Sequence, residues 1–96
     1  MRVEFHPEAQ LELAQAALHY EEQLPGLGLD LNAEVERTVS LLVVAPRMGS
    51  LLDAEHRRFS VQRFPFSLIY RDLGSVLLVV AVAHKRRRPR YWADRR

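Results

Sequence analysis

The chain has no cysteine among its 96 residues, which excludes disulfides and thiolate metal sites. It also has no apolar run long enough to cross a bilayer, because the longest, Val76 to Ala83, is far shorter than the roughly 20 residues that a helical span needs. The N-terminus lacks the apolar core of a secretory signal. The length of 96 residues predicts a single domain covering residues 1–96, and these absences predict a cytoplasmic protein with no membrane association.

Lysine is almost missing: 13 of the 14 basic residues are arginine, and Lys85 is the one lysine. Arginine offers a planar fork to phosphate or carboxylate and does not give up its proton, so it clamps anions but is a poor general base. There is also no glycine-rich phosphate loop, no metal-ligand spacing and no Ser/His/Asp order. We therefore expect no metal and no cofactor.

The basic residues are concentrated in the second half of the chain. Residues 1–48 hold three bases and eight acids, a net charge of −5, whereas residues 49–96 hold eleven bases and four acids, a net charge of +7. From His84 to Arg96 there are seven bases and one acid, together with Tyr91 and Trp92. Such a cationic, aromatic stretch suits a polyanion or an acidic partner.

Periodicity divides the chain into elements. The spacing of apolar residues predicts helices from Pro7 to Leu24 and from Gly28 to Ala45, joined tightly enough to lie antiparallel. After residue 50 the period changes from 3.6 to 2. We expect strands over residues 2–5, 56–64, 66–71 and 76–83, the last buried on both faces or central. The predicted fold class is α+β: an N-terminal strand and a helical hairpin packed on a small antiparallel sheet.

Each predicted helix has one apolar stripe and several acids. The stripes consist of Leu13, Ala14, Ala17, Tyr20 and Leu24 in the first helix, and of Leu31, Val35, Val39 and Leu42 in the second. The acids Glu21, Glu22, Glu34 and Glu36 are expected on solvated faces.

Several short motifs follow one another in a characteristic order along the chain. They are Phe5-His6-Pro7-Glu8-Ala9, Tyr20-Glu21-Glu22, Gly26-Leu27-Gly28, Pro46-Arg47-Met48-Gly49, Arg57-Arg58-Phe59, Phe64-Pro65-Phe66-Ser67-Leu68-Ile69-Tyr70, Ala81-Val82-Ala83-His84-Lys85-Arg86-Arg87 and Pro89-Arg90-Tyr91-Trp92. In this order and spacing the chain resembles the ParE/RelE superfamily of bacterial type II toxins over essentially its whole length.

The resemblance implies a small basic toxin that a cognate antitoxin wraps and neutralises in a hetero-oligomer. RelE-like members cleave mRNA in the ribosomal A site without a metal, whereas ParE-like members poison DNA gyrase. A shared fold does not decide between these targets. The candidates for a catalytic role are Arg58, Arg63, Arg86 and Tyr91. The candidates for binding target or phosphate are Arg57, Arg58, Arg63, Lys85, Arg86, Arg87, Arg88, Arg90 and Trp92.

The chain departs from the RelE pattern where proton transfer is concerned. The lysines expected before the first central strand are absent, and that segment is Leu51-Leu52-Asp53-Ala54-Glu55-His56. His56 or His84 could act as the base instead, because imidazole titrates near neutrality, or each could simply be a polar residue at a strand end. Trp92 could stack on a base, insert into a partner or cover the sheet.

The ending with Pro89 and Tyr91-Trp92 is more similar to the plasmid stabilisation, ParE-like subgroup. The favoured hypothesis is therefore a toxin that inhibits growth by binding gyrase, which needs no catalytic base. The alternatives are a metal-independent, ribosome-dependent endoribonuclease and a degenerate toxin that only binds its antitoxin.

Overall fold

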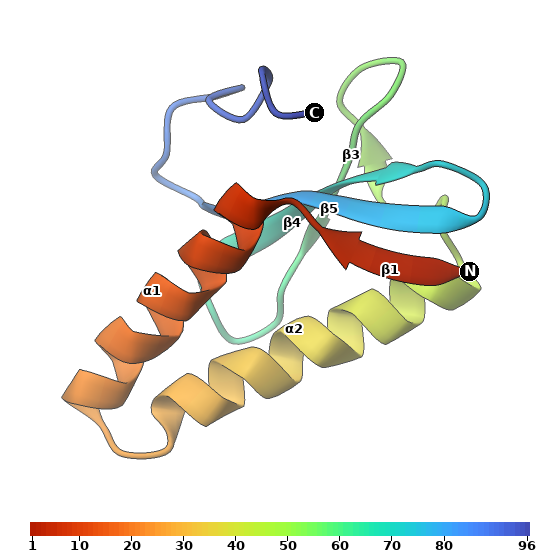
Figure 1. Cartoon of the computed structure of the whole chain (residues 1–96). Helices are drawn as coiled ribbons and strands as arrows, with labels where there is room; N and C mark the ends of the chain where they lie inside the picture. The colour runs from red at the N-terminus through yellow and green to blue at the C-terminus, as the bar shows by residue number, and fades with distance from the viewer.

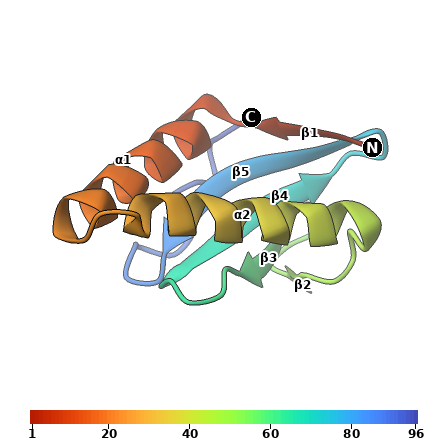
Figure 2. The ribbon, with the colours of Figure 1, turned by 90° about the horizontal axis from the view of Figure 1, so that it is seen from below.

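The computed structural model describes all residues 1–96 and has three layers. The elements are β1 (Arg2–Phe5), α1 (Pro7–Gln23), α2 (Leu27–Val44), β2 (Ser50–Leu51), β3 (Arg57–Ser60), β4 (Phe66–Asp72) and β5 (Val76–His84). The sheet lies between the helices on one face and the C-terminal tail, residues 85–96, on the other (Figure 1). From the helical side, α2 runs across the sheet and α1 lies beside it (Figure 2). The α+β class is confirmed, and neither helix is long and apolar enough to cross a membrane.

The five strands form one mixed sheet in the order β1-β5-β4-β3-β2. Strands β2 to β5 pair antiparallel, as expected, but β1 pairs parallel to β5, with Arg2 opposite Val76 and Phe5 opposite Val79. Parallel strands cannot be joined by a tight turn, and here the helices and strands β2 to β4 separate β1 from β5 along the chain. The N-terminal strand β1 therefore forms one edge of the sheet. Strand β5 lies inside the sheet between β1 and β4 and is covered on both faces, which explains its apolar residues on both faces.

The strand predicted over residues 56–64 is shorter than expected. β3 ends at Ser60, and Arg63 then adopts a positive φ of 71° in a turn. The backbone N–H of Val61 donates to the Phe66 carbonyl at 2.9 Å and closes that turn. The two-residue strand β2, which the sequence did not predict, pairs with β3 at the far edge of the sheet.

The hairpin between the helices is held by the carboxylate of Glu21, which is exposed as predicted but also makes hydrogen bonds. Glu21 accepts hydrogen bonds from the backbone N–H groups of Gly26 at 2.8 Å and Gly28 at 3.0 Å. These donors lie at the start of α2, where backbone N–H groups have no partner within the helix. A β-carbon on Gly28 would collide with the Ala17 carbonyl oxygen, so glycine allows the helices to approach closely. The motifs around residues 20–22 and 26–28 therefore form one structural unit.

The main core lies between the helices and the sheet. Of the predicted stripes, Leu31, Val35 and Leu42 are fully buried, and Leu13, Ala17, Tyr20 and Val39 pack against them. Ala14 and Leu24, in contrast, are exposed. Glu34 is 5% exposed and pairs with Arg37, so it does not lie on a solvated face.

A smaller core lies on the opposite face of the sheet, beneath the tail. It consists of Ile69, Val80, Ala81 and Trp92. The register shifts between Ile69, which pairs with Ala81, and Tyr70, which pairs with Val79, so Val80 is the extra residue of a bulge. A bulge interrupts strand alternation. Val80 and Ala81 consequently both belong to the core beneath the tail, while Val79 and Val82 belong to the main core.

Candidate functional site: a cationic groove under the C-terminal tail

The tail and the sheet enclose a groove of about 530 Å³. Its wall is the segment that runs from the end of β5 into the tail, and its floor is the sheet face turned away from the helices. The residues that line it are Leu52, Arg58, Ser60, Ser67, Ile69, Ala83, His84, Lys85, Arg87, Arg88, Pro89, Arg90, Tyr91 and Trp92. Five of these are lysine or arginine and none is acidic, so the groove is suited to an anion.

Strand register explains which residues form the floor. Arg58 lies opposite Ile69, and Ser60 lies opposite Ser67 two pairs further along the same ladder. Residues two positions apart on a strand share a face, and residues directly opposite share it too. Arg58 is therefore placed on the groove side by the same alternation that turns its neighbour Arg57 to the helical side.

Most of the groove's basic side chains have no ion-pair partner within the chain. Arg90 pairs with Asp53 at 3.1 Å. The other four basic side chains in the lining, Arg58, Lys85, Arg87 and Arg88, make no salt bridge. The guanidinium of Arg87 lies 3.9 Å from the centre of the Tyr91 ring, a cation–π contact that orients its charge. Unneutralised cations grouped in this way favour binding of a polyanion or an acidic segment.

Three predicted site residues lie outside this groove. Arg57 donates from Nη1 to the carbonyl oxygens of Arg47 at 3.2 Å and Gly49 at 2.8 Å, so it supports the β2 segment. Arg63 lies in the turn after β3 and faces Asp30 of α2 at 3.4 Å. Arg86 is exposed in the turn after β5 but is not among the lining residues, unlike Lys85 and Arg87 on either side. Arg58 thus lines the groove, whereas Arg57 and Arg63, the other two arginines of this segment, do not.

The hydroxyl of Tyr91 points away from any incoming ligand. It donates to Glu12 Oε2 at 2.7 Å. Burial, followed by this hydrogen bond to a carboxylate, raises the pKa of Tyr91 above its ordinary value of 10. The ring lines the groove, but the proton is held in the contact with α1.

The two histidines that could act as a base are both engaged. His84 lines the groove, and its Nδ1 accepts the backbone N–H of Arg86 at 3.0 Å. The neutral ring therefore carries its proton on Nε2 and has no free lone pair there. His56 lies outside the lining, with Nδ1 2.9 Å from Asp53 and a buried Nε2 that has no hydrogen-bond partner.

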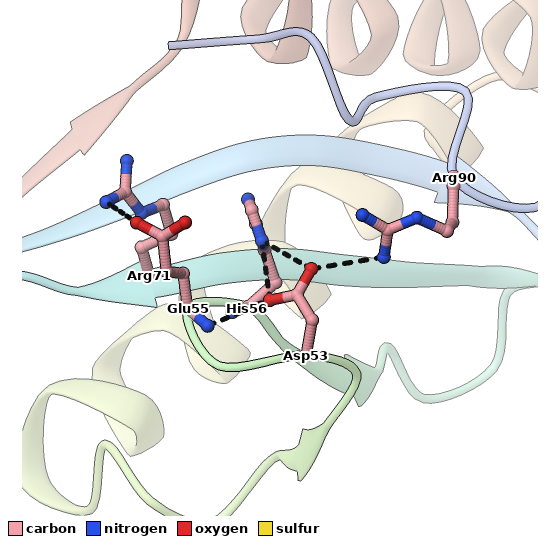
Figure 3. Close-up of polar contacts among 5 residues, drawn as sticks. All are labelled: Asp53, Glu55, His56, Arg71 and Arg90. Atoms are coloured by element: carbon pink, nitrogen blue, oxygen red, sulfur yellow. Dashed lines mark hydrogen bonds and ion pairs between the residues drawn. The ribbon is translucent and has the colours of Figure 1, made fainter.

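The carboxylate of Asp53 makes hydrogen bonds to both the β2–β3 loop and the tail (Figure 3). Its Oδ1 accepts the backbone N–H groups of Glu55 at 2.8 Å and His56 at 2.7 Å, and its Oδ2 accepts Arg90 at 3.1 Å. The pKa of Asp53 falls well below 3.8, and the largest cause is the hydrogen bond from the Glu55 backbone. Burial opposes this shift, and the contacts from His56 and Arg90 add to it. Beside it, Arg71 of β4 holds the Glu55 side chain at 2.8 Å.

Trp92 covers the sheet, one of the three roles considered for it. Its side chain is 4% exposed and packs with Ile69, Val80 and Ala81. The His56 ring lies 4.6 Å from its ring, centre to centre. A ring this deeply buried is not available to stack on a nucleobase while the tail is docked.

Replacing Asp53 with alanine is expected to loosen the β2–β3 loop. The backbone N–H groups of Glu55 and His56 lose their shared acceptor, and Arg90 loses its ion pair. Hydrogen exchange of these two amides should accelerate about tenfold or more. Asp72→Ala is the matched control, because that carboxylate caps the distant β4–β5 turn through Gly74. Unchanged exchange at residues 55 and 56 would show that Asp53 does not order the loop.

Sequence reasoning missed several residues that shape the groove. Glu12 and Asp53 each hold part of the tail, and Ser60 and Ser67 contribute to the floor. Only one signal pointed to Glu12, namely an acid placed between the apolar residues Leu11 and Leu13. The structure brings together no group of three or more His, Asp or Glu side chains that could hold a metal.

Comparison with known proteins gives a consistent result. A solved structure described as a chromosomal ParDE toxin–antitoxin system from P. aeruginosa matches with a TM-score of 0.75, 19% identity, and coverage of 88% of this chain and 95% of that one. This similarity shows a shared fold. No curated protein sequence matches significantly. The family model for the ParE toxin of the type II toxin–antitoxin system parDE matches residues 3–89. The chain therefore belongs to the ParE toxin family of type II toxin–antitoxin systems.

Proposed function

We propose that this ParE-family chain inhibits growth by binding DNA gyrase in the cytoplasm and is neutralised by a cognate antitoxin. The family match supports the toxin role. The cationic groove supplies the surface with which the toxin contacts its target. Association through such a surface is a protein–protein event that uses charge and shape and needs no chemical step.

The choice of gyrase rests on one observation: the groups in the groove that could transfer a proton are engaged in hydrogen bonds within the chain. Tyr91 donates to Glu12, and His84 accepts a backbone N–H at the nitrogen that would otherwise act as base. The remaining polar groups in the lining include four basic side chains without an ion-pair partner, and three of them are arginines, a residue type that binds anions but is a poor general base. A binding toxin uses this set directly, whereas a metal-independent nuclease needs a positioned acid and base.

An endoribonuclease remains the second candidate because Arg58, Arg87 and Arg88 line one groove. Guanidinium groups placed together can clamp a phosphodiester and stabilise the charge that develops on it. On this hypothesis the ribosome supplies what the groove lacks, and mRNA is the ligand.

The proposed antitoxin would contact two surfaces. The exposed side of α1 presents Leu11, 51% exposed, and Leu18, 62% exposed, which lie two turns apart on one helix face. An apolar helix of the antitoxin would cover these, and an acidic segment would neutralise the groove. The expected assembly is a toxin–antitoxin hetero-oligomer.

The proposal is tested with purified chain, purified gyrase and relaxed plasmid. Increasing amounts of the chain should block supercoiling and leave cleaved gyrase–DNA complexes, and addition of the antitoxin should restore activity. Parallel induction in cells should produce filaments and a DNA damage response. Rapid cleavage of mRNA at codon boundaries, with gyrase unaffected, would replace the proposal by the nuclease hypothesis. Normal growth and active gyrase would leave a protein that only binds its antitoxin.

A further inference from the structure

One carboxylate on α1, that of Glu12, holds two residues of the tail. Glu12 Oε2 accepts the Tyr91 hydroxyl at 2.7 Å and Arg95 Nη2 at 2.9 Å, while Oε1 accepts Arg95 Nη1 at 2.9 Å. The two-point contact with Arg95 is the bidentate geometry that makes guanidinium–carboxylate pairs strong. Both partners of this pair are largely buried, with 13% of each side chain exposed. No other ion pair in the molecule has both side chains so shielded from water.

The same contact closes an open edge of the sheet. Strand β1 pairs with β5 only as far as Val79, so the following residues of β5 have no neighbouring strand on that side. Glu12 Oε1 accepts the Val82 backbone N–H at 3.0 Å, and Arg95 Nη1 donates to the Val80 carbonyl at 3.1 Å. The side chains of Glu12 and Arg95 thus take the place of a neighbouring strand and satisfy two backbone groups of β5.

We propose that Glu12 is the positioning residue of the cationic groove: by holding Tyr91 and Arg95 it docks the tail on β5 and so places the basic side chains that line the groove. Only the effect of Glu12 on growth inhibition rests on the proposed gyrase function; the docking of the tail and the binding of anions do not.

The influence of Glu12 reaches the groove through Tyr91. The tyrosine hydroxyl is held by Glu12, and the tyrosine ring lies in the groove wall beneath the Arg87 guanidinium. Arg95 also packs on that ring, 5.0 Å from its centre. If the carboxylate is lost, the ring loses its fixed position, and the guanidinium stacked on it loses its support. The tail's other ion pair, Arg90 with Asp53, is more exposed and is screened by solvent, and Trp92 adds apolar contacts with the sheet.

Lowering the pH should release the tail when Glu12 becomes protonated. Burial raises the pKa of Glu12, but hydrogen bonds from Arg95, Tyr91 and Val82 together outweigh it and bring the pKa below 4.5. A carboxylate with a lowered pKa in the folded state stabilises docking above its unfolded pKa, and this contribution is lost as pH falls through the folded pKa. The charged and titratable groups that face it are Arg95 and Tyr91 from the tail and Glu8 from α1, which acts through Arg95. Docking should therefore persist at neutral pH and weaken below about pH 4.5.

The test compares Glu12→Gln with Glu22→Gln. Both remove one negative charge from α1, but Glu22 is exposed and makes no hydrogen bond or ion pair. Three measurements are made on the full chain: trypsin cleavage between residues 85 and 91, emission of Trp92, which is the one tryptophan, and calorimetric binding of inorganic tripolyphosphate.

With Glu12→Gln, tail cleavage should accelerate about tenfold or more, Trp92 emission should shift to the red and tripolyphosphate affinity should fall about tenfold. Glu22→Gln should change each readout less than twofold. Below about pH 4.5 the emission of wild-type Trp92 should shift to the red, and Glu12→Gln should lose most of this shift because its tail is already released; Asp53, which holds Arg90, accounts for the remainder. A transition of unchanged amplitude and midpoint in Glu12→Gln would contradict the proposed role of Glu12.

The proposal is overturned if Glu12→Gln leaves tail cleavage and tripolyphosphate affinity unchanged, or if the wild-type chain does not bind tripolyphosphate. Should Glu12→Gln fail to fold, Tyr91→Phe decides, because it removes only the hydroxyl from the contact with Glu12. Its tripolyphosphate affinity should fall about threefold, and an unchanged affinity overturns the proposal. A wild-type chain that binds tripolyphosphate but leaves gyrase active would refute the proposed function alone.

Discussion

Exchanging Arg87 and Arg88 for glutamate should abolish growth inhibition and weaken binding to gyrase at least about a hundredfold, since each charged contact at an interface is worth on the order of a tenfold change. The two residues are half of the unpaired basic side chains that line the groove. Both are exposed and lie beyond the last strand, so the reversal should leave the thermal midpoint nearly unchanged.

Supercoiling inhibition measures this effect, with Arg2→Glu/Arg47→Glu as the control. The control changes the net charge by the same amount, but its residues lie outside the groove. A comparison of single alanine variants adds resolution. Arg87→Ala should weaken inhibition more than Arg86→Ala, because only Arg87 lines the groove. The reverse order, or an equal loss in the control, would show that the groove is not the binding surface.

Gly49→Ala is expected to destabilise the fold by about 3 kcal/mol, and thus to lower the thermal midpoint by about 10 °C or more. A β-carbon at this position would lie 2.5 Å from the Tyr70 hydroxyl and 2.9 Å from the Arg58 carbonyl oxygen. The hydroxyl cannot withdraw without cost, because it accepts the Gly49 N–H at 2.9 Å and donates to the Pro46 carbonyl at 2.7 Å. Tyr70 itself is fully buried, so broken hydrogen bonds there are not replaced by water.

Thermal or urea unfolding measures the loss, with the neighbouring Ser50→Ala as the control. Ser50 is exposed and its side chain makes no hydrogen bond, so its change should lie within about 0.5 kcal/mol. Combining Gly49→Ala with Tyr70→Phe removes the closest collision. The double variant should therefore lose less stability than the sum of the two single losses. Strict additivity would indicate that the hydroxyl does not cause the effect.

The helices and central strands could be predicted because their signals are local. Proline at residue 7, Pro25-Gly26 and Pro46 bound the helices within a residue or two of their observed ends. The unbroken apolar run from Val76 predicted a strand that is buried on both faces or central, and β5 lies inside the sheet between β1 and β4. The parallel pairing of β1 and the short β2 were not predictable, because each depends on the position of a partner that is far away or only two residues long.

The groove could be predicted only in part. The clustering of basic residues after β5 was visible in the sequence, and Lys85, Arg87, Arg88 and Arg90 do line one groove. The roles of individual arginines were not visible. Arg57 and Arg58 are adjacent in sequence, yet one donates to two backbone carbonyl groups and the other lies on the groove floor. Strand alternation separates them, and its phase is set by pairing with β4.

Composition and periodicity alone determined the α+β class, the helix boundaries and the excess of arginine in the second half, and the superfamily resemblance came from short motifs in their order along the chain. These properties are recorded in neighbouring residues, so no distant contact is needed to infer them. Tertiary structure alone decided which cations are unpaired, that Trp92 is buried, and that Glu12 meets Arg95 across 83 positions of sequence. Such contacts arise from sheet register and the path of the tail, which no local pattern specifies.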